Sequence, residues 1–200
     1  HGFVKVAAAV PFVRVADCTY NISRIEALTR EADAKGVEII TFPELSITGY
    51  TCGDFFLKPF LNDQAEEALL ELAKRTADTS VLIIVGMPIR IKSQLFNAAV
   101  ALQSGQILGA IPKTYLPNYR EFQEARWFVA ARDLQLAHVK IGDFEIPIGH
   151  NVLFRSGKVA IGIEICEDMW TPYTPGTRLA LYGAQIIFNL SASNELAGKN

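Results

Sequence analysis

The sequence predicts an α/β domain built on mixed sheets. Short apolar runs of strand character alternate along the chain with segments whose apolar residues recur at helical spacing, an order typical of α/β proteins. Two of the strand-like runs are separated by Ser104-Gly105, a hairpin signal, so antiparallel neighbours are expected in the sheet. Two hundred residues, 50% of them hydrophobic, suffice for one domain with a substantial core.

Apolar periodicity predicts each element of the first half. Mainly apolar runs predict three strands, over 3–10, 37–42 and 81–87. A first helix closes at Gly36 and has its apolar face on Ile22, Ile25, Leu28 and Ala32. A second helix spans 64–77 and has its apolar face on Ala65, Ala68, Leu69, Leu72 and Ala73.

The second half is predicted to be richer in strands. Runs over 97–102 and 106–111 form the hairpin, and shorter strands are expected over 134–140, 144–148 and 152–155. The next strand ends at Cys166, because apolar residues alternate at Val159, Ile161, Ile163 and Ile165. A third helix over 177–182 and a last strand over 185–189 complete the pattern, without an internal repeat or a linker.

Composition excludes several classes of protein. A net charge of −2 with scattered basic residues does not predict nucleic-acid binding, and no apolar run reaches the ~18 residues of a membrane span. The N-terminus lacks a signal peptide's charged and apolar regions, so we expect a cytoplasmic protein. No Cys/His cluster has metal-ligand spacing, and neither His138 nor His150 lies in a catalytic motif, so no metal and no catalytic histidine are expected. Three cysteines without paired spacing predict no disulfide framework, and Cys18 and Cys52 are expected to be buried hydrophobes.

Cys166 is the candidate nucleophile. It follows an apolar strand, and open α/β sheets place their active sites at the carboxyl ends of strands. Its acidic neighbours are expected to raise the pKa of the thiol and so to oppose formation of the reactive thiolate; they are Glu164, Glu167 and Asp168. A catalytic Cys166 therefore needs a cation and a base from elsewhere in the chain.

Two other predicted strands end in a proline followed by a charged residue. Pro43-Glu44 follows the strand over 37–42, and Pro112-Lys113 follows the strand over 106–111. Taken singly, such a charge is most often a solvated loop residue. Together, the three strand ends deliver a base, a cation and a nucleophile, which is the set that covalent catalysis by Cys166 requires.

Three ordered motifs resemble a known family. FPELSITGYTCGDFF (42–56), PKTYLPNYREFQEARWF (112–128) and GIEICEDMW (162–170), followed by NLSAS, are similar to the glutamine-hydrolysing domains of glutamine-dependent NAD synthetases, which belong to the nitrilase superfamily of carbon-nitrogen hydrolases. The resemblance implies an α-β-β-α sandwich over residues 1–200, a domain incomplete at its C-terminal side. It also implies that the ATP-dependent synthetase domain is absent from this chain, which has no Walker-type phosphate loop. No cofactor is expected here, since ATP and Mg would serve only that synthetase domain.

The resemblance also implies residue roles. Glu44 is the general base, Cys166 forms a thioester, and Lys113 stabilises the oxyanion together with the backbone N–H of Glu167. Glu121, eight residues after Lys113, resembles the superfamily's second glutamate, which orients the lysine. The residues expected to line the glutamine pocket are Tyr50, Tyr119, Glu167, Trp170 and Ser193.

Three hypotheses remain open from the sequence. The favoured one is a glutamine amidase whose ammonia serves ATP-dependent amidation of nicotinic acid adenine dinucleotide to NAD. The alternatives are a free-standing nitrilase-type amidase or carbamoylase acting on another small amide, and a catalytically silent scaffold. The expected partners are glutamine, the C-terminal synthetase domain and further copies of the chain, but no nucleic acid and no membrane.

Overall fold

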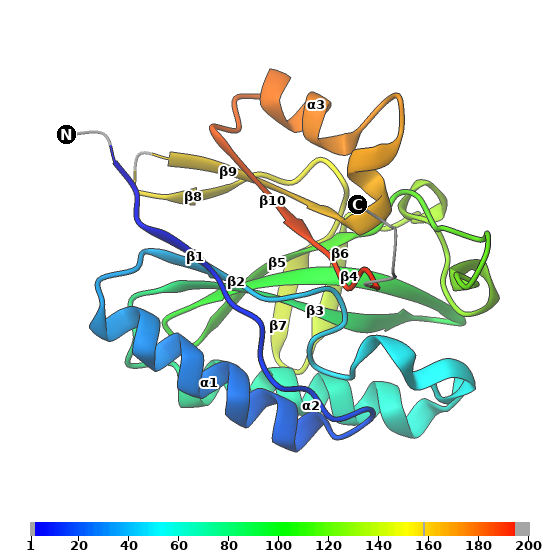
Figure 1. Ribbon diagram of the computed structural model, residues 1–200, viewed down its shortest axis with the longest axis horizontal. Helices are drawn as coiled ribbons and strands as arrows, with labels where there is room; N and C mark the ends of the chain where they lie inside the picture. Colours follow the sequence, from blue (N-terminus) through cyan, green and yellow to red (C-terminus); the bar gives the residue numbers. More distant parts are fainter. Residues whose placement is uncertain (1–2, 158, 195–200) are drawn as a thin grey trace.

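The computed structural model describes residues 3–157 and 159–194, which form four layers in the order helix, sheet, sheet, helix (Figure 1). The first layer holds α1 (Cys18–Ala34) and α2 (Pro59–Arg75). The first sheet contains β1 (Val6–Ala8), β2 (Ile39–Thr41), β3 (Leu82–Ile91), β4 (Gln94–Gln103) and β5 (Gln106–Pro112). The second sheet contains β8 (Phe154–Ser156), β9 (Val159–Ile165) and β10 (Ile186–Leu190), and α3 (Pro175–Leu181) covers it. The predicted α-β-β-α arrangement is confirmed.

Both main sheets are mixed, as predicted. In the first sheet β1, β2 and β3 are parallel, whereas β3, β4 and β5 are antiparallel neighbours. In the second sheet β9 is parallel to β10 and antiparallel to β8. Ser104 and Gly105 form the predicted hairpin turn, both with positive φ (49° and 79°), the conformation that a tight hairpin needs.

The core lies between the layers. The facing surfaces of the two sheets bury Ile161, Ile163 and Ile165 of β9 against Ile84 and Ala99 of the first sheet. The other face of β9 is buried too, because α3 lies on it: a Cβ at Gly162 would come within 3.0 Å of the Leu179 side chain. Packing on both faces fixes the carboxyl end of this strand, and Cys166 is the next residue in the chain.

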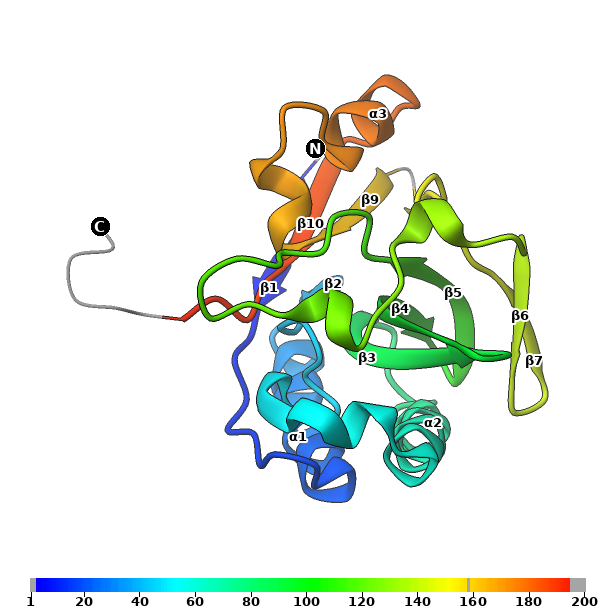
Figure 2. The ribbon, with the colours of Figure 1, turned by 90° about the vertical axis from the view of Figure 1, so that its right-hand side faces the viewer.

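Several predicted boundaries were wrong for identifiable reasons. α2 begins at Pro59 rather than at residue 64, because proline suits the first position of a helix, and α3 begins at Pro175 for the same reason. The N-terminal strand is only Val6–Ala8, the part that pairs with β2. Much of the strand predicted over 134–140 is irregular, and β6 (His138–Ile141) pairs only with β7 (Phe144–Pro147) in a separate ribbon, which Figure 2 shows beside the first sheet.

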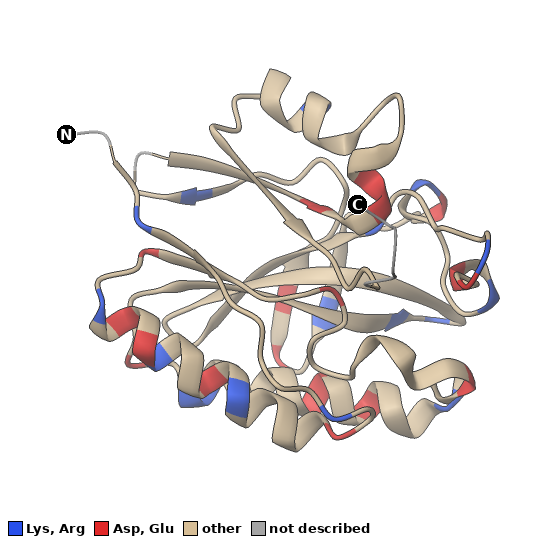
Figure 3. Cartoon of the chain, in the orientation of Figure 1, with Lys and Arg blue, Asp and Glu red and all other residues tan. Residues whose placement is uncertain are grey.

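Acidic and basic residues are interspersed along α1 and α2 rather than gathered in one basic stripe (Figure 3). On α1, Arg30 pairs with Glu26 and Asp78, each at 3.0 Å. Among the described residues, no helix combines the length and apolar character needed to cross a membrane.

Candidate active site

The three strand ends singled out in the sequence carry Glu44, Lys113 and Cys166. β2 ends at Thr41, β5 at Pro112 and β9 at Ile165, so each predicted residue follows its strand within three positions. Lys113 is fully buried, and its Nζ donates to Glu44 Oε1 at 2.6 Å and to Glu124 Oε1 at 2.7 Å. The lysine is therefore held between two buried carboxylates.

Glu44 lies in a turn that depends on a close approach of the backbone. The turn continues through Leu45, which has φ of 52°. A Cβ on Gly86 of β3 would lie 2.3 Å from the backbone nitrogen of Leu45 and 2.7 Å from the carbonyl oxygen of Pro43. The side-chain amide of Asn97 on β4 donates to Glu44 Oε1 at 2.6 Å. Two sheet residues that the sequence did not single out, Gly86 and Asn97, therefore position this carboxylate.

Opposing effects act on the charge of Lys113. Burial alone would lower the pKa of its ammonium group, but the carboxylates of Glu44 and Glu124 outweigh burial and raise that pKa. Lys113 therefore stays protonated across the physiological range. An ammonium group has three donors, and two of them serve Glu44 and Glu124.

Cys166 occupies a sharp elbow between β9 and the 3-10 turn η4 (Cys166–Trp170). Its φ of 47° lies in the left-handed region that residues other than glycine rarely adopt. The side chain is half-buried, and Ser191 Oγ, just after β10, donates to Sγ at 3.4 Å. Strained conformations of this kind concentrate at functional sites, where they present a nucleophile at the end of a sheet.

The pKa of the Cys166 thiol is raised to about 11. Burial is the largest cause, the charge of Glu44 comes second, and the charge of Lys113 acts in the opposite direction. We expected the acidic sequence neighbours of Cys166 to raise the pKa of its thiol. Two of these carboxylates instead bind backbone N–H groups: Glu164 accepts from Gly176 at 2.7 Å, and Asp168 accepts from Ile165 at 3.1 Å. The charges that raise this pKa come from Glu44 and, to a smaller extent, Glu124, both distant in sequence.

Asp168 joins the segments that carry Lys113 and Cys166, a role not predicted from the sequence. This buried carboxylate accepts from the backbone N–H groups of Thr114 at 3.0 Å, Tyr115 at 2.8 Å and Ile165 at 3.1 Å. Burial raises the pKa of Asp168 to about 7, although those backbone hydrogen bonds act to lower it. The only sequence signal was an acid placed between Cys166 and an apolar pair.

The prediction that Glu121 orients Lys113 is corrected by the structure. The second carboxylate on Lys113 Nζ belongs to Glu124, which is buried, and Tyr50 O–H also donates to it at 2.7 Å. Glu121 is exposed, and its carboxylate accepts a hydrogen bond from the Asn194 side-chain amide. Glu121 lies in an irregular segment and Glu124 begins the short 3-10 turn η2 (Glu124–Arg126), so no regular period relates the two side chains and the spacing could not separate them.

Two of the predicted pocket residues line one cavity. Tyr119 and Glu167 line a cavity of about 320 Å³, and Tyr119 O–H donates to the Glu167 carboxylate at 2.9 Å. Tyr50 does not line this cavity, and its O–H donates to Glu124 at 2.7 Å. Trp170 is 73% exposed and does not line this cavity, and Ser193 is exposed in the segment after β10. Within residues 3–157 and 159–194, no group of three His, Cys, Asp or Glu side chains is arranged to hold a metal.

Comparisons with known proteins agree with this geometry. The family model of carbon-nitrogen hydrolases matches residues 5–198. The glutamine-dependent NAD(+) synthetase of Mycobacterium tuberculosis H37Rv is 36% identical over 202 residues, which cover 100% of this chain but 30% of that protein. The crystal structure of a glutamine-dependent NAD(+) synthetase from Cytophaga hutchinsonii has a TM-score of 0.85 and 31% identity, and the match covers 98% of this chain and 32% of that one.

A more distant match shows the fold alone. An amidase of the nitrilase superfamily from Nesterenkonia AN1 has a TM-score of 0.75 at 18% identity, with 96% of this chain and 66% of that chain covered. The chain thus has the nitrilase fold, and it spans about 30% of the length of the mycobacterial NAD(+) synthetases that it matches. With the family model matching nearly all of its length, the chain belongs to the carbon-nitrogen hydrolase family.

Proposed function

We propose that this chain hydrolyses the side-chain amide of glutamine, with Cys166 as nucleophile, Glu44 as general base and Lys113 as the cation. The observation that supports this most strongly is the buried Lys113 ammonium held by Glu44 and Glu124, in a site where the charges of Glu44 and Lys113 both act on the Cys166 thiol. This arrangement supplies a proton acceptor, a fixed positive charge and a thiol in one site. Similarity to proteins named glutamine-dependent NAD(+) synthetases supports glutamine as the substrate.

The first half of the reaction forms a thioester. Glu44 takes the proton of Cys166 Sγ, and the thiolate attacks the amide carbon of glutamine. The negative charge that develops on the amide oxygen is stabilised by the third donor of Lys113 and by the backbone N–H of Glu167. Collapse of this intermediate breaks the carbon-nitrogen bond, Glu44 gives its proton to the departing nitrogen, and ammonia leaves.

The second half regenerates the enzyme. Glu44 takes a proton from water, the resulting hydroxide attacks the thioester carbon, and the thiolate leaves with that proton while glutamate is released. A thiol with a pKa of about 11 is almost entirely protonated in the free enzyme, so proton transfer to Glu44 has to accompany attack. Such coupling protects the thiol from reacting before the substrate is bound.

Recognition of glutamine uses the cavity beside the elbow. The Glu167 carboxylate, already bonded to Tyr119 O–H, suits the α-ammonium group of the substrate. Tyr119, whose single O–H serves Glu167, holds that carboxylate in place, and the Ser193 hydroxyl is a donor for the substrate α-carboxylate. The ammonia then serves a synthetase domain of the same polypeptide, where ATP and Mg support amidation of nicotinic acid adenine dinucleotide to NAD; self-association and a cytoplasmic location remain predictions.

Substrate preference and one cysteine variant test this proposal in the whole polypeptide. Ammonia release should be fastest with glutamine among glutamine, asparagine and simple aliphatic amides. Cys166→Ala should abolish NAD formation with glutamine but keep it with added ammonium, whereas Cys52→Ala, a buried cysteine outside the site, should keep both. Equal turnover of simple amides would favour a free-standing type of amidase. Loss of both activities in Cys166→Ala would make Cys166 a structural residue.

A further inference from the structure

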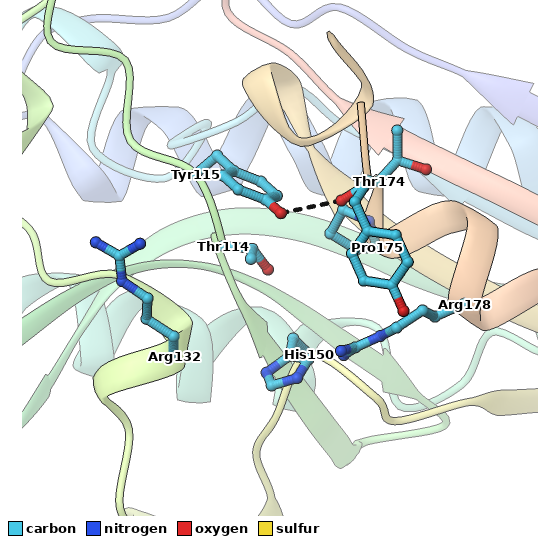
Figure 4. A pocket seen from close by; sticks show the side chains of 8 residues that line it. Thr114, Tyr115, Arg132, His150, Thr174, Pro175 and Arg178 are labelled. Carbon is cyan, nitrogen blue, oxygen red and sulfur yellow. Dashed lines mark hydrogen bonds between the residues drawn. The ribbon is translucent and has the colours of Figure 1, made fainter. Parts of the chain in front are cut away.

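A second cavity adjoins the one lined by Tyr119 and Glu167, and the two share Thr114, Tyr115 and Arg132 in their linings. The second cavity has a volume of about 200 Å³ and opens between the segment after β5, the turn after β7 and the start of α3 (Figure 4). Thr114 and Tyr115 form one wall, and Tyr115 O–H donates to the backbone carbonyl of Tyr173 at 3.0 Å. The backbone N–H groups of Thr114 and Tyr115 are bonded to Asp168, so this wall is fixed from behind.

The lining of this cavity holds three basic residues, of which the two arginines carry a permanent positive charge. Arg132, His150 and Arg178 come from three different parts of the chain, and none of the eight described residues that line the cavity has a carboxylate. Burial, and the charge of Arg178, lower the pKa of His150. Figure 4 shows the His150 ring close to the Arg178 side chain. Arg132 is exposed at the rim, with an Asp133 oxygen 4.0 Å from its Nε. Among the residues that line the cavity, Arg178 therefore has an aromatic neighbour, the Tyr173 ring at 5.9 Å, but no carboxylate.

Two buried polar atoms of this cavity have no hydrogen-bond partner among the described residues: Arg178 Nε and Thr114 Oγ1. A guanidinium group can only donate, and a hydroxyl can donate, so both atoms call for an acceptor. Nearly all buried polar groups in folded proteins are satisfied, and an exception commonly marks an absent water or ion. Two such atoms in one cationic cavity indicate an anionic acceptor.

We propose that this cavity binds a small oxyanion of the phosphate class. Its oxygens would accept from Arg178 Nε and Thr114 Oγ1, with His150 beside them. The donors approach from different elements, and a tetrahedral anion accepts in several directions at once, whereas a carboxylate accepts in one plane. Because Thr114 directly follows Lys113, a bound anion ties the start of α3 to the segment that carries the catalytic cation. The proposal does not depend on amide hydrolysis.

Calorimetric titration of inorganic phosphate into the whole polypeptide, at ionic strength held constant with chloride, tests this site. We expect wild-type binding with a Kd below about 1 mM. Arg178→Gln should weaken it by about tenfold or more, and Thr114→Val by about threefold, since hydrogen bonds to charged groups are the stronger kind. Arg155→Gln, an exposed arginine on β8 outside the cavity, is the matched control and should stay within about twofold.

Other outcomes would overturn the proposal. Equal phosphate binding by wild type and Arg178→Gln would place the anion elsewhere, for example in another domain of the polypeptide. No binding heat up to about 10 mM phosphate would contradict the site itself. Titration of glutamate tests whether the cavity takes a carboxylate instead of phosphate. If glutamate binds through Arg178 and Thr114 and phosphate does not, the phosphate class is wrong. If circular dichroism shows that Arg178→Gln is unfolded, the Thr114→Val result decides.

Discussion

Replacing Glu124 by glutamine tests the electrostatics of the site, and Glu121→Gln is its matched control. Glu124 Oε1 accepts from Lys113 Nζ and from Tyr50 O–H, each at 2.7 Å, in a buried setting. Glu121, three positions earlier, is exposed and bonded to Asn194. Both substitutions keep the shape of the side chain and remove one negative charge. Only the one at position 124 should disturb Lys113.

The expected effects on turnover and on thiol reactivity have opposite signs. A hydrogen bond to a charged group contributes about 1.5–3 kcal/mol, so Glu124→Gln should lower kcat/KM for glutamine hydrolysis by roughly ten- to a hundredfold. The charge of Glu124 also helps to raise the pKa of Cys166. Removing it should lower that pKa by about half to one unit and make alkylation about three- to tenfold faster at neutral pH.

Ammonia release and iodoacetamide alkylation, measured on the same preparations, separate this reasoning from general damage to the fold. A variant that is merely destabilised would not combine slower turnover with a more reactive thiol. Glu121→Gln should leave both rates within about threefold of wild type. If Glu121→Gln gives the larger loss of turnover, or if alkylation of Glu124→Gln is unchanged, the assignment of Glu124 as the partner of Lys113 in catalysis is wrong.

Three further predictions follow from the site. Gly86→Ala should destabilise the fold by about 1–3 kcal/mol in urea unfolding, because the new Cβ would lie 2.3 Å from the Leu45 nitrogen; an unchanged midpoint would contradict the close approach. Asp168→Asn deprives at least one backbone N–H, such as that of Thr114, of its acceptor, so both Tm and turnover should fall, the latter by about tenfold; wild-type values would refute the link between the two segments. With a thiol pKa of about 11, alkylation of substrate-free Cys166 should rise about tenfold per pH unit between about pH 7 and 9, and a plateau there would mean a thiolate at neutral pH.

Much of the fold was readable because the signals are local. Alternating and mainly apolar runs predicted the strands that form both sheets, and Ser104-Gly105 predicted the antiparallel turn. The same signals placed Glu44, Lys113 and Cys166 at strand ends, and the structure agrees, although their catalytic roles remain to be tested. The helix starts at Pro59 and Pro175 were missed because the predicted starts, residues 64 and 177, lie five and two residues after the prolines that begin the helices.

The sequence by itself determined the α/β class, the mixed sheets and the three strand ends, because hydrophobic period and turn chemistry depend on neighbouring residues. Only the tertiary structure decided which carboxylates contact the residues at these strand ends. Glu124 rather than Glu121 faces Lys113, and its other donor, Tyr50, lies 74 residues away in the chain. Asp168 likewise finds two of its three donors more than fifty residues away. In such segments, a buried carboxylate points toward the hydrogen-bond donors that surround it. Because those donors lie far away in the chain, no local sequence pattern encodes the direction of the side chain.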